Sequence, residues 1–275
     1  MGSSTSITDL YVRETHIIPA SSPATNVKHT VRRELAEPLK LSVHEYKVHG
    51  TSDELGFNVI LTHGTSFNKY LWQLRPVIGI GHSFGGGAMC HAAMMEPEQF
   101  AATILIEPIL FQMRAQTEAV ANLALKRRDW WASADEVATT FFKSQGFQDW
   151  DERQLRMYIE HGTYPVDRDS HSSPRMLKTP KEQEAATYLA RPCPEILGLL
   201  QQSRRRHHFI WGSASKVISA TRRDAIERII RPPSTSQVLP GAGHLIPMTH
   251  PEALATVLEG ILQDASHILQ HRTKL

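Results

Sequence analysis

The chain has 275 residues, of which 41% are hydrophobic and 21% charged, with a formal net charge of +2. This composition is typical of a globular protein with a full-sized core, built as one domain or as one domain with an insertion, and the charge argues against a nucleic-acid partner. No apolar stretch approaches the roughly 20 residues that span a bilayer, and the N-terminus has no signal-peptide core, so we expect a soluble protein without a transmembrane segment.

The predicted elements alternate between strands and helices. Strand signals occur at 39–48, 57–62, 77–81 and 102–106, with a weaker one at 10–18 and two late ones at 207–211 and 236–239. Helical patterns occur at 86–95, 219–230 and 251–270. Continuous apolar strands that alternate with helices indicate a mostly parallel sheet with helices on both faces, which is a doubly wound α/β fold.

The segment from 108 to 206 interrupts this alternation, since it indicates several helices with irregular links and few strands. We therefore predict an α/β core formed by residues 1–107 and 207–275, with 108–206 as a helical cap insertion. Its large apolar side chains either form the core of the insertion or line an acyl pocket over the active site. They are Trp130, Trp131, Phe141, Phe142, Phe147, Trp150, Met157 and Tyr158.

The sequence GHSFGGG at 81–87 follows the apolar strand VIGI. A serine between glycines on a tight turn from strand to helix is typical of a nucleophile elbow, and the small residues let the helix pack against the strand. This predicts Ser83 as a catalytic nucleophile. The backbone N–H of Phe84, at the start of the helix, is the expected first oxyanion donor. A structural turn with an incidental serine is the alternative.

Serine needs a base within hydrogen-bonding reach. His244 lies in LPGAGHLIPMTHPE, on a Gly-rich loop between the last strand and the last helix, and is the predicted base. His250 is the rival, but Pro251 and Glu252 after it indicate a helix start, so His250 is interpreted as a residue near that cap.

The second oxyanion donor is expected after the strand that ends in LTHGTSF, where Gly64 allows close approach and the N–H of Thr65 would face the substrate carbonyl. The acid is predicted at Glu107, in ILIEPIL, because the later loop GSASKV contains no carboxylate. A buried glutamate paired to another group is the alternative for Glu107, and Asp167 in the insertion is the alternative acid.

The cysteines and the termini bear on location. Cys90 and Cys193 cannot form a disulfide framework, fit a reducing or peroxisomal compartment, and lack metal-ligand spacing, so no metal site is expected. Gly2 and Ser6 match a myristoylation pattern that a polar N-terminus also produces by chance. Thr273, Lys274 and Leu275 differ in one residue from SKL, the C-terminal tripeptide that directs proteins to peroxisomes. We therefore predict a peroxisomal protein with the import receptor as a partner. If this signal is not recognised, we expect a cytoplasmic protein. The last helix is expected to end near Gln270.

The motifs HGTSF, GHSFGGG, IEP and PGAGHLIPMTHPE, in this order, resemble the α/β-hydrolase superfamily. Within it, the chain is most similar to fungal peroxisomal hydrolases, including the yeast peroxisomal lipase type and those encoded in Alternaria host-selective toxin clusters. The resemblance implies an ester or thioester of a fatty-acid-like or polyketide chain as a small-molecule substrate. It implies no cofactor.

One departure from that family is the spacing of its motifs. Ser83 follows His63 by only 20 residues, where the family normally has a strand and two helices. A parallel crossover needs about a dozen residues, and the residues between the two strands suffice for that connection alone. We therefore expect one strand and its flanking helices to be missing between residues 66 and 76. Either this is a degenerate copy or its exon boundaries are wrong, which leaves a catalytically inactive binding protein as an alternative function. An acyltransferase with the same triad is another.

Overall fold

A five-stranded parallel sheet forms the centre of the molecule. The computed structural model describes residues 11–19, 40–48, 58–62, 77–167, 173–190 and 192–272. The strand order is β10-β9-β5-β4-β3, and every neighbouring pair is parallel. The strands are β3 (Asn58–Thr62), β4 (Val77–His82), β5 (Phe100–Ile106), β9 (Arg206–Gly212) and β10 (Thr235–Leu239). This confirms the predicted α/β fold class.

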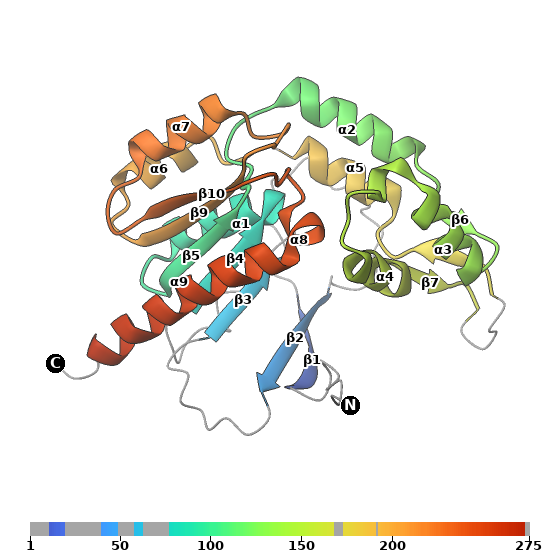
Figure 1. Cartoon of the computed structure of the whole chain (residues 1–275), viewed down its shortest axis with the longest axis horizontal. Helices are drawn as coiled ribbons and strands as arrows, with labels where there is room; N and C mark the ends of the chain where they lie inside the picture. The colour runs from blue at the N-terminus through green and yellow to red at the C-terminus, as the bar shows by residue number, and fades with distance from the viewer. Residues whose placement is uncertain are drawn as a thin grey trace.

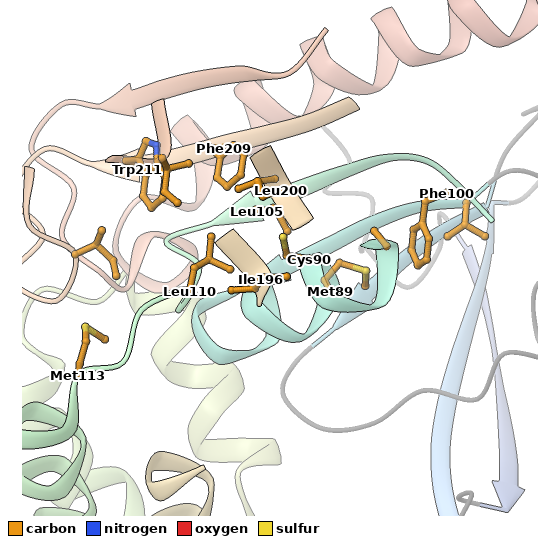
Figure 2. Close-up of a cluster of buried hydrophobic side chains, with 14 residues drawn as sticks. Met89, Cys90, Phe100, Leu105, Leu110, Met113, Ile196, Leu200, Phe209 and Trp211 are labelled. Carbon is orange, nitrogen blue, oxygen red and sulfur yellow. The ribbon is translucent and has the colours of Figure 1, made fainter. Parts of the chain in front are cut away.

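Helices cover both faces of this sheet, because its central strands β4, β5 and β9 bury side chains on both sides. On one face lie α1 (Ser83–Met95), α6 (Ile196–Gln202) and α7 (Ala220–Ile229), and on the other lie α8 (Ile246–Thr249) and α9 (Pro251–Arg272) (Figure 1). The alternation is clear in β9, where Phe209 and Trp211 point into the first core and Ile210 into the second. Figure 2 shows the first core, in which Cys90 packs with Leu105 and Leu200.

The predicted elements of the core agree with the structure within a few residues. The nucleophile helix begins at Ser83 rather than at 86, because the strand passes directly into the helix. The last helix continues to Arg272, two residues beyond the expected end at Gln270. Thr273 to Leu275 and Gly2 lie outside the described residues.

The short connection between β3 and β4 has a visible effect on the sheet. Among the described strands, β3 pairs only with β4 and so lies at the edge of the sheet. The preceding strand β2 (Lys40–Val48) pairs antiparallel with β1 (Tyr11–Pro19) in a separate two-stranded sheet, apart from the main one in Figure 1. An open edge and a preceding strand paired elsewhere are the two arrangements that a missing strand allows.

The insertion, residues 108–205 between β5 and β9, is mostly helical. Its helices besides α6 are α2 (Arg114–Lys126), α3 (Ala134–Lys143), α4 (Glu152–His161) and α5 (Lys181–Leu189), with the 3-10 helix η3 (Gln145–Phe147). It also holds a small antiparallel sheet that the sequence did not predict, of order β6-β8-β7, formed by Trp130–Trp131, Arg175–Leu177 and Thr163–Pro165. Strands of two or three residues are too short to show a periodic pattern.

The aromatic side chains of the insertion form its own core. Phe141 stacks on Phe147 and Tyr158 with ring centroids 5.0 and 5.5 Å away, and Trp131 meets Phe141 edge-on. Trp150 packs against the same cluster. This confirms the interpretation as an insertion core for most of the predicted residues, whereas Trp130, Phe142 and Met157 are exposed.

Candidate active site

Ser83 lies where β4 passes into α1. Its backbone φ is +56°, in the left-handed region that side chains rarely adopt. The turn is tight, since a Cβ added to Gly81 would lie 2.6 Å from the carbonyl oxygen of Gly85 in the first turn of α1. The Ser83 carbonyl accepts the N–H of Ile109 at 3.0 Å, which ties the turn to the residues after β5. The sequence GHSFGGG thus folds into the sharp elbow that it predicts.

His244 approaches Ser83 from the loop between β10 and α8. Its Nε2 lies 2.9 Å from Ser83 Oγ. The loop is held from β4, since His82 Nε2 lies 2.8 Å from the carbonyl oxygen of His244. The insertion also contacts the segment that follows, because the N–H of Asp151 donates to the carbonyl oxygen of Met248 at 2.8 Å. These contacts fix the histidine over the carboxyl edge of the sheet.

Glu107 is the first residue after β5, and its side chain is fully buried. Its φ is +46°, so Ser83 and Glu107 are the two non-glycine residues with positive φ in the described part of the chain. Glu107 Oε2 lies 3.0 Å from His244 Nδ1. The pairing of Ile106 with Ile210 and of His82 with Ile106 brings these strand ends to one edge. Strained backbone at both positions points to a constrained functional site.

The hydrogen bonds determine which ring nitrogen of His244 carries the hydrogen. An ionised carboxylate only accepts, so His244 Nδ1 carries the hydrogen and donates it to Glu107. In a neutral imidazole the other nitrogen is then an acceptor, and Nε2 faces the hydroxyl of Ser83. A serine hydroxyl that donates to a base held by a carboxylate has the geometry needed for nucleophilic attack.

The structure also locates the other candidate residues. Phe84 is the second residue of α1, where helix geometry leaves the N–H without an intrahelical acceptor. Thr65 lies outside the described residues. His250 lies between the end of α8 and the start of α9, and its carbonyl oxygen accepts the N–H of Leu254 at 3.0 Å, which confirms the interpretation as a residue near the helix cap. Asp167 is exposed on the insertion, whereas the carboxylate beside His244 is that of Glu107.

Both thiols are free, and neither is activated. Burial raises the pKa of Cys90 to about 12. The hydrogen bond from Cys193 Sγ to Glu195 raises the pKa of Cys193, which lines the same cavity as Ser83. Both are therefore protonated at neutral pH and poor nucleophiles.

A cavity of about 850 Å³ opens beside Ser83 and His244. Its walls come from α1, from the residues after β5, and from the facing ends of α2 and α5. Much of the lining is apolar, including Ile109, Leu110, Phe111, Met113, Val120 and Leu189. The aromatic side chains of the insertion core do not line it among the described residues, so the prediction that some of them form an acyl pocket is wrong there. These aromatic side chains pack against each other instead.

Three residues that support the site were missed by sequence analysis. Gly212 N–H donates to Glu107 Oε1 at 2.8 Å, and a side chain at Gly212 would collide with the carbonyl oxygens of Ala242 and Gly243. Ser215 Oγ lies 2.5 Å from Glu107 Oε2, and His82 holds the His244 loop. The loop GSASKV carried a usable signal, since a loop without a carboxylate can still donate hydrogen bonds to one.

The fold agrees with a comparison with known proteins. A family model described as alpha/beta hydrolase family matches residues 49–257, and the chain belongs to this family.

Similar proteins come from fungi. The abhydrolase domain-containing protein AFT2-1 of Alternaria alternata is 28% identical over 120 residues, which are 42% of this chain and 45% of that protein. The type I acyl-CoA thioesterase mpaH of Penicillium brevicompactum is 32% identical over 69 residues, 23% of this chain and 16% of that protein. The chain thus matches less than half the length of these relatives.

Among solved structures, the peroxisomal alpha-beta-hydrolase Lpx1 from Saccharomyces cerevisiae superposes with a TM-score of 0.71 at 16% identity, covering 95% of this chain and 90% of that one. At this identity the likeness shows a shared fold. None of the helices that the structure describes is long and apolar enough to cross a membrane. Within the same residues, no group of three or more His, Cys, Asp or Glu side chains is arranged to hold a metal ion.

Proposed function

We propose that this α/β hydrolase is a serine hydrolase that cleaves an acyl ester or thioester through an acyl-enzyme intermediate. Ser83 is the nucleophile, His244 the general base and Glu107 the acid that orients it. The observation that supports this most strongly is the continuous chain of contacts from Ser83 Oγ through His244 to Glu107, at 2.9 and 3.0 Å, beside a cavity of about 850 Å³.

The first half of the proposed reaction forms the acyl-enzyme. Ser83 Oγ attacks the acyl carbonyl carbon while its proton passes to His244 Nε2, and Glu107 stabilises the resulting imidazolium through Nδ1. The carbonyl oxygen becomes negative and accepts hydrogen bonds from the N–H of Phe84 and, as a further part of the proposal, of Thr65. The bond to the leaving oxygen or sulfur breaks, and His244 Nε2 gives its proton to that atom.

The second half releases the acid. His244 Nε2 takes a proton from water, whose oxygen attacks the acyl carbon, and the bond between that carbon and Ser83 Oγ breaks as the proton returns to Ser83. The chain's own residues carry every proton in these steps, so we propose no metal or organic cofactor. An acyltransferase would use an alcohol, amine or thiol in place of water, and product analysis separates the two.

The proposed substrate carries a fatty-acid-like or polyketide acyl chain. The apolar lining of the cavity suits such a chain, and its volume lies within the roughly 300–1,000 Å³ of small-molecule sites. The short match to an acyl-CoA thioesterase supports a thioester, and the resemblance to hydrolases of Alternaria toxin clusters supports a place in fungal secondary metabolism.

A catalytically inactive binding protein is the competing function, and the short connection between β3 and β4 is the observation that favours it. Turnover distinguishes the two. Purified protein should hydrolyse p-nitrophenyl octanoate or octanoyl-CoA, and Ser83→Ala should lower kcat/KM by about 10³-fold or more. A variant that folds, by its thermal unfolding, yet keeps the wild-type rate would refute the assignment of the nucleophile.

We propose that Thr273 to Leu275 act as a signal for import into peroxisomes. A fluorescent reporter fused in front of residues 266–275 should enter peroxisomes in fungal cells, and deletion of the last three residues should leave it in the cytosol. If the intact tail leaves the reporter wholly cytosolic, the signal is wrong and cytoplasmic residence becomes the proposal.

A further inference from the structure

The loop after β9 holds the proposed acid although it carries no carboxylate of its own. Ser215 is half-buried, and its Oγ lies 2.5 Å from Glu107 Oε2. This is the same oxygen that lies 3.0 Å from His244 Nδ1. The other oxygen, Oε1, accepts the N–H of Gly212 at 2.8 Å. One loop therefore contacts both oxygens of a fully buried side chain.

The direction of the Ser215 hydroxyl follows from its partners. Glu107 as a carboxylate only accepts, so the hydroxyl donates its hydrogen to Oε2. The N–H of Ile218, which only donates, lies 3.2 Å from the same Oγ and occupies a lone pair. The backbone N–H of Ser215 donates to the carbonyl oxygen of Gly212 at 3.2 Å and closes the turn. The hydroxyl is thus fixed from two sides.

This contact affects the histidine because Oε2 is shared. With the Ser215 hydroxyl present, the negative charge on Oε2 is divided between two donors. Without it, His244 Nδ1 would be the one donor of these two left on Oε2. The carboxylate would also lose one of the contacts that hold it in line with Nδ1.

We infer that Ser215 is a positioning residue for the reaction, holding Glu107 Oε2 in line with His244 Nδ1. This inference rests on the proposed function. The loop that carries the acid in many such enzymes here fixes an acid supplied by β5.

The test compares two alanine variants of one loop. In Ser215→Ala we expect kcat/KM to fall by about 10-fold, mainly through kcat, since one hydrogen bond to a charged group is lost. Ser215→Thr keeps the hydroxyl and should restore the wild-type rate.

Ser213→Ala is the matched control, because Ser213 Oγ accepts the N–H of Gly241 at 2.8 Å and belongs to the same loop but makes no hydrogen bond to Glu107. It should leave the rate unchanged. A Ser215→Ala rate equal to that of the wild type, or an equal loss in Ser213→Ala, would overturn the inference.

A second readout separates this inference from the proposed function. The proton on His244 Nδ1 gives a downfield NMR resonance when it is shared with a carboxylate, and this signal needs no substrate. We expect Ser215→Ala to shift it and Ser213→Ala to leave it in place. Wild-type protein that hydrolyses nothing would refute the function, whereas a resonance unmoved by Ser215→Ala would refute the role of Ser215.

Discussion

The carboxyl edge of the sheet and the insertion core are held together by different forces. At the edge, side chains from distant parts of the chain meet through hydrogen bonds, with His244 linked to both Ser83 and Glu107. In the insertion, neighbours along the chain meet through stacked aromatic rings, as in the cluster around Phe141. The edge therefore depends on direction and charge, and the insertion on volume and burial.

This difference indicates which part of the molecule can change in sequence without loss of the proposed reaction. A change of one polar atom at the edge alters the proton path, while the insertion affects the reaction only through the walls of the cavity. Those walls come from α2 and α5 rather than from the aromatic cluster. Substitutions at the edge should therefore change the reaction, and substitutions in the insertion core should change the stability.

The largest effect after loss of the nucleophile is expected at Glu107. Glu107→Gln removes the charge but keeps the size, so the base loses the partner that orients it and stabilises its protonated form. We expect kcat to fall by about 10³- to 10⁴-fold without loss of the folded state, measured by steady-state kinetics and circular dichroism. Asp167→Asn is the matched control and should keep nearly full activity. The reverse pattern would move the acid to the insertion.

The insertion core should respond in stability instead. Phe141 is 4% exposed and its neighbour Phe142 is 44% exposed. Phe141→Ala should lower the free energy of unfolding of the insertion by about 3–5 kcal/mol, because it leaves a cavity among stacked rings. Phe142→Ala should cost less than about 1 kcal/mol. Urea unfolding monitored by tryptophan fluorescence gives both values, and equal losses would contradict the burial pattern.

Acid should destabilise the sheet through two buried histidines of β9. His207 is 1% exposed between Thr103 and Ser203, and burial lowers the pKa of both His207 and His208 to about 4. An unfolded histidine has a pKa of about 6.5, so the unfolded chain binds more protons between about pH 6.5 and 4.

The free energy of unfolding should therefore decrease as the pH falls through this window, by up to about 3 kcal/mol for each histidine. Urea unfolding at several pH values measures the slope. His207→Gln, which keeps an amide able to bond Thr103 or Ser203, should flatten it, and a change at exposed His161 should not. A slope that His207→Gln leaves intact would assign the acid sensitivity elsewhere.

The smallest effect is expected on the wall of the cavity. Val120 lines the cavity from α2, whereas Leu123, three residues later on the same helix, does not. Val120→Trp should reduce kcat/KM for octanoyl esters by about 10-fold and leave acetyl esters unchanged, because only the longer chain reaches α2. Leu123→Trp should change neither. Equal effects on both esters would show that the acyl chain lies elsewhere.

Much of the edge could be predicted from the sequence because its residues lie in local patterns. The tight turn around Ser83 requires small neighbours, and the loop of His244 is marked by glycines. Ser215 and Gly212 had only an indirect signal, a loop that lacks a carboxylate, since their contacts with Glu107 appear only when β9 pairs beside β5. The same holds for the cavity wall, because the packing of α2 on α5 joins residues that are far apart in the chain.

The most direct test of the central proposal is covalent labelling of Ser83. Incubation of the purified full chain with a fluorophosphonate, followed by peptide mass spectrometry, should place the phosphonyl group on Ser83 within GHSFGGG. Ser83→Ala should abolish labelling, and His244→Gln should slow it strongly because the base is lost. Wild-type protein that stays unlabelled while folded, or a label on another residue, would contradict the account and favour a binding protein.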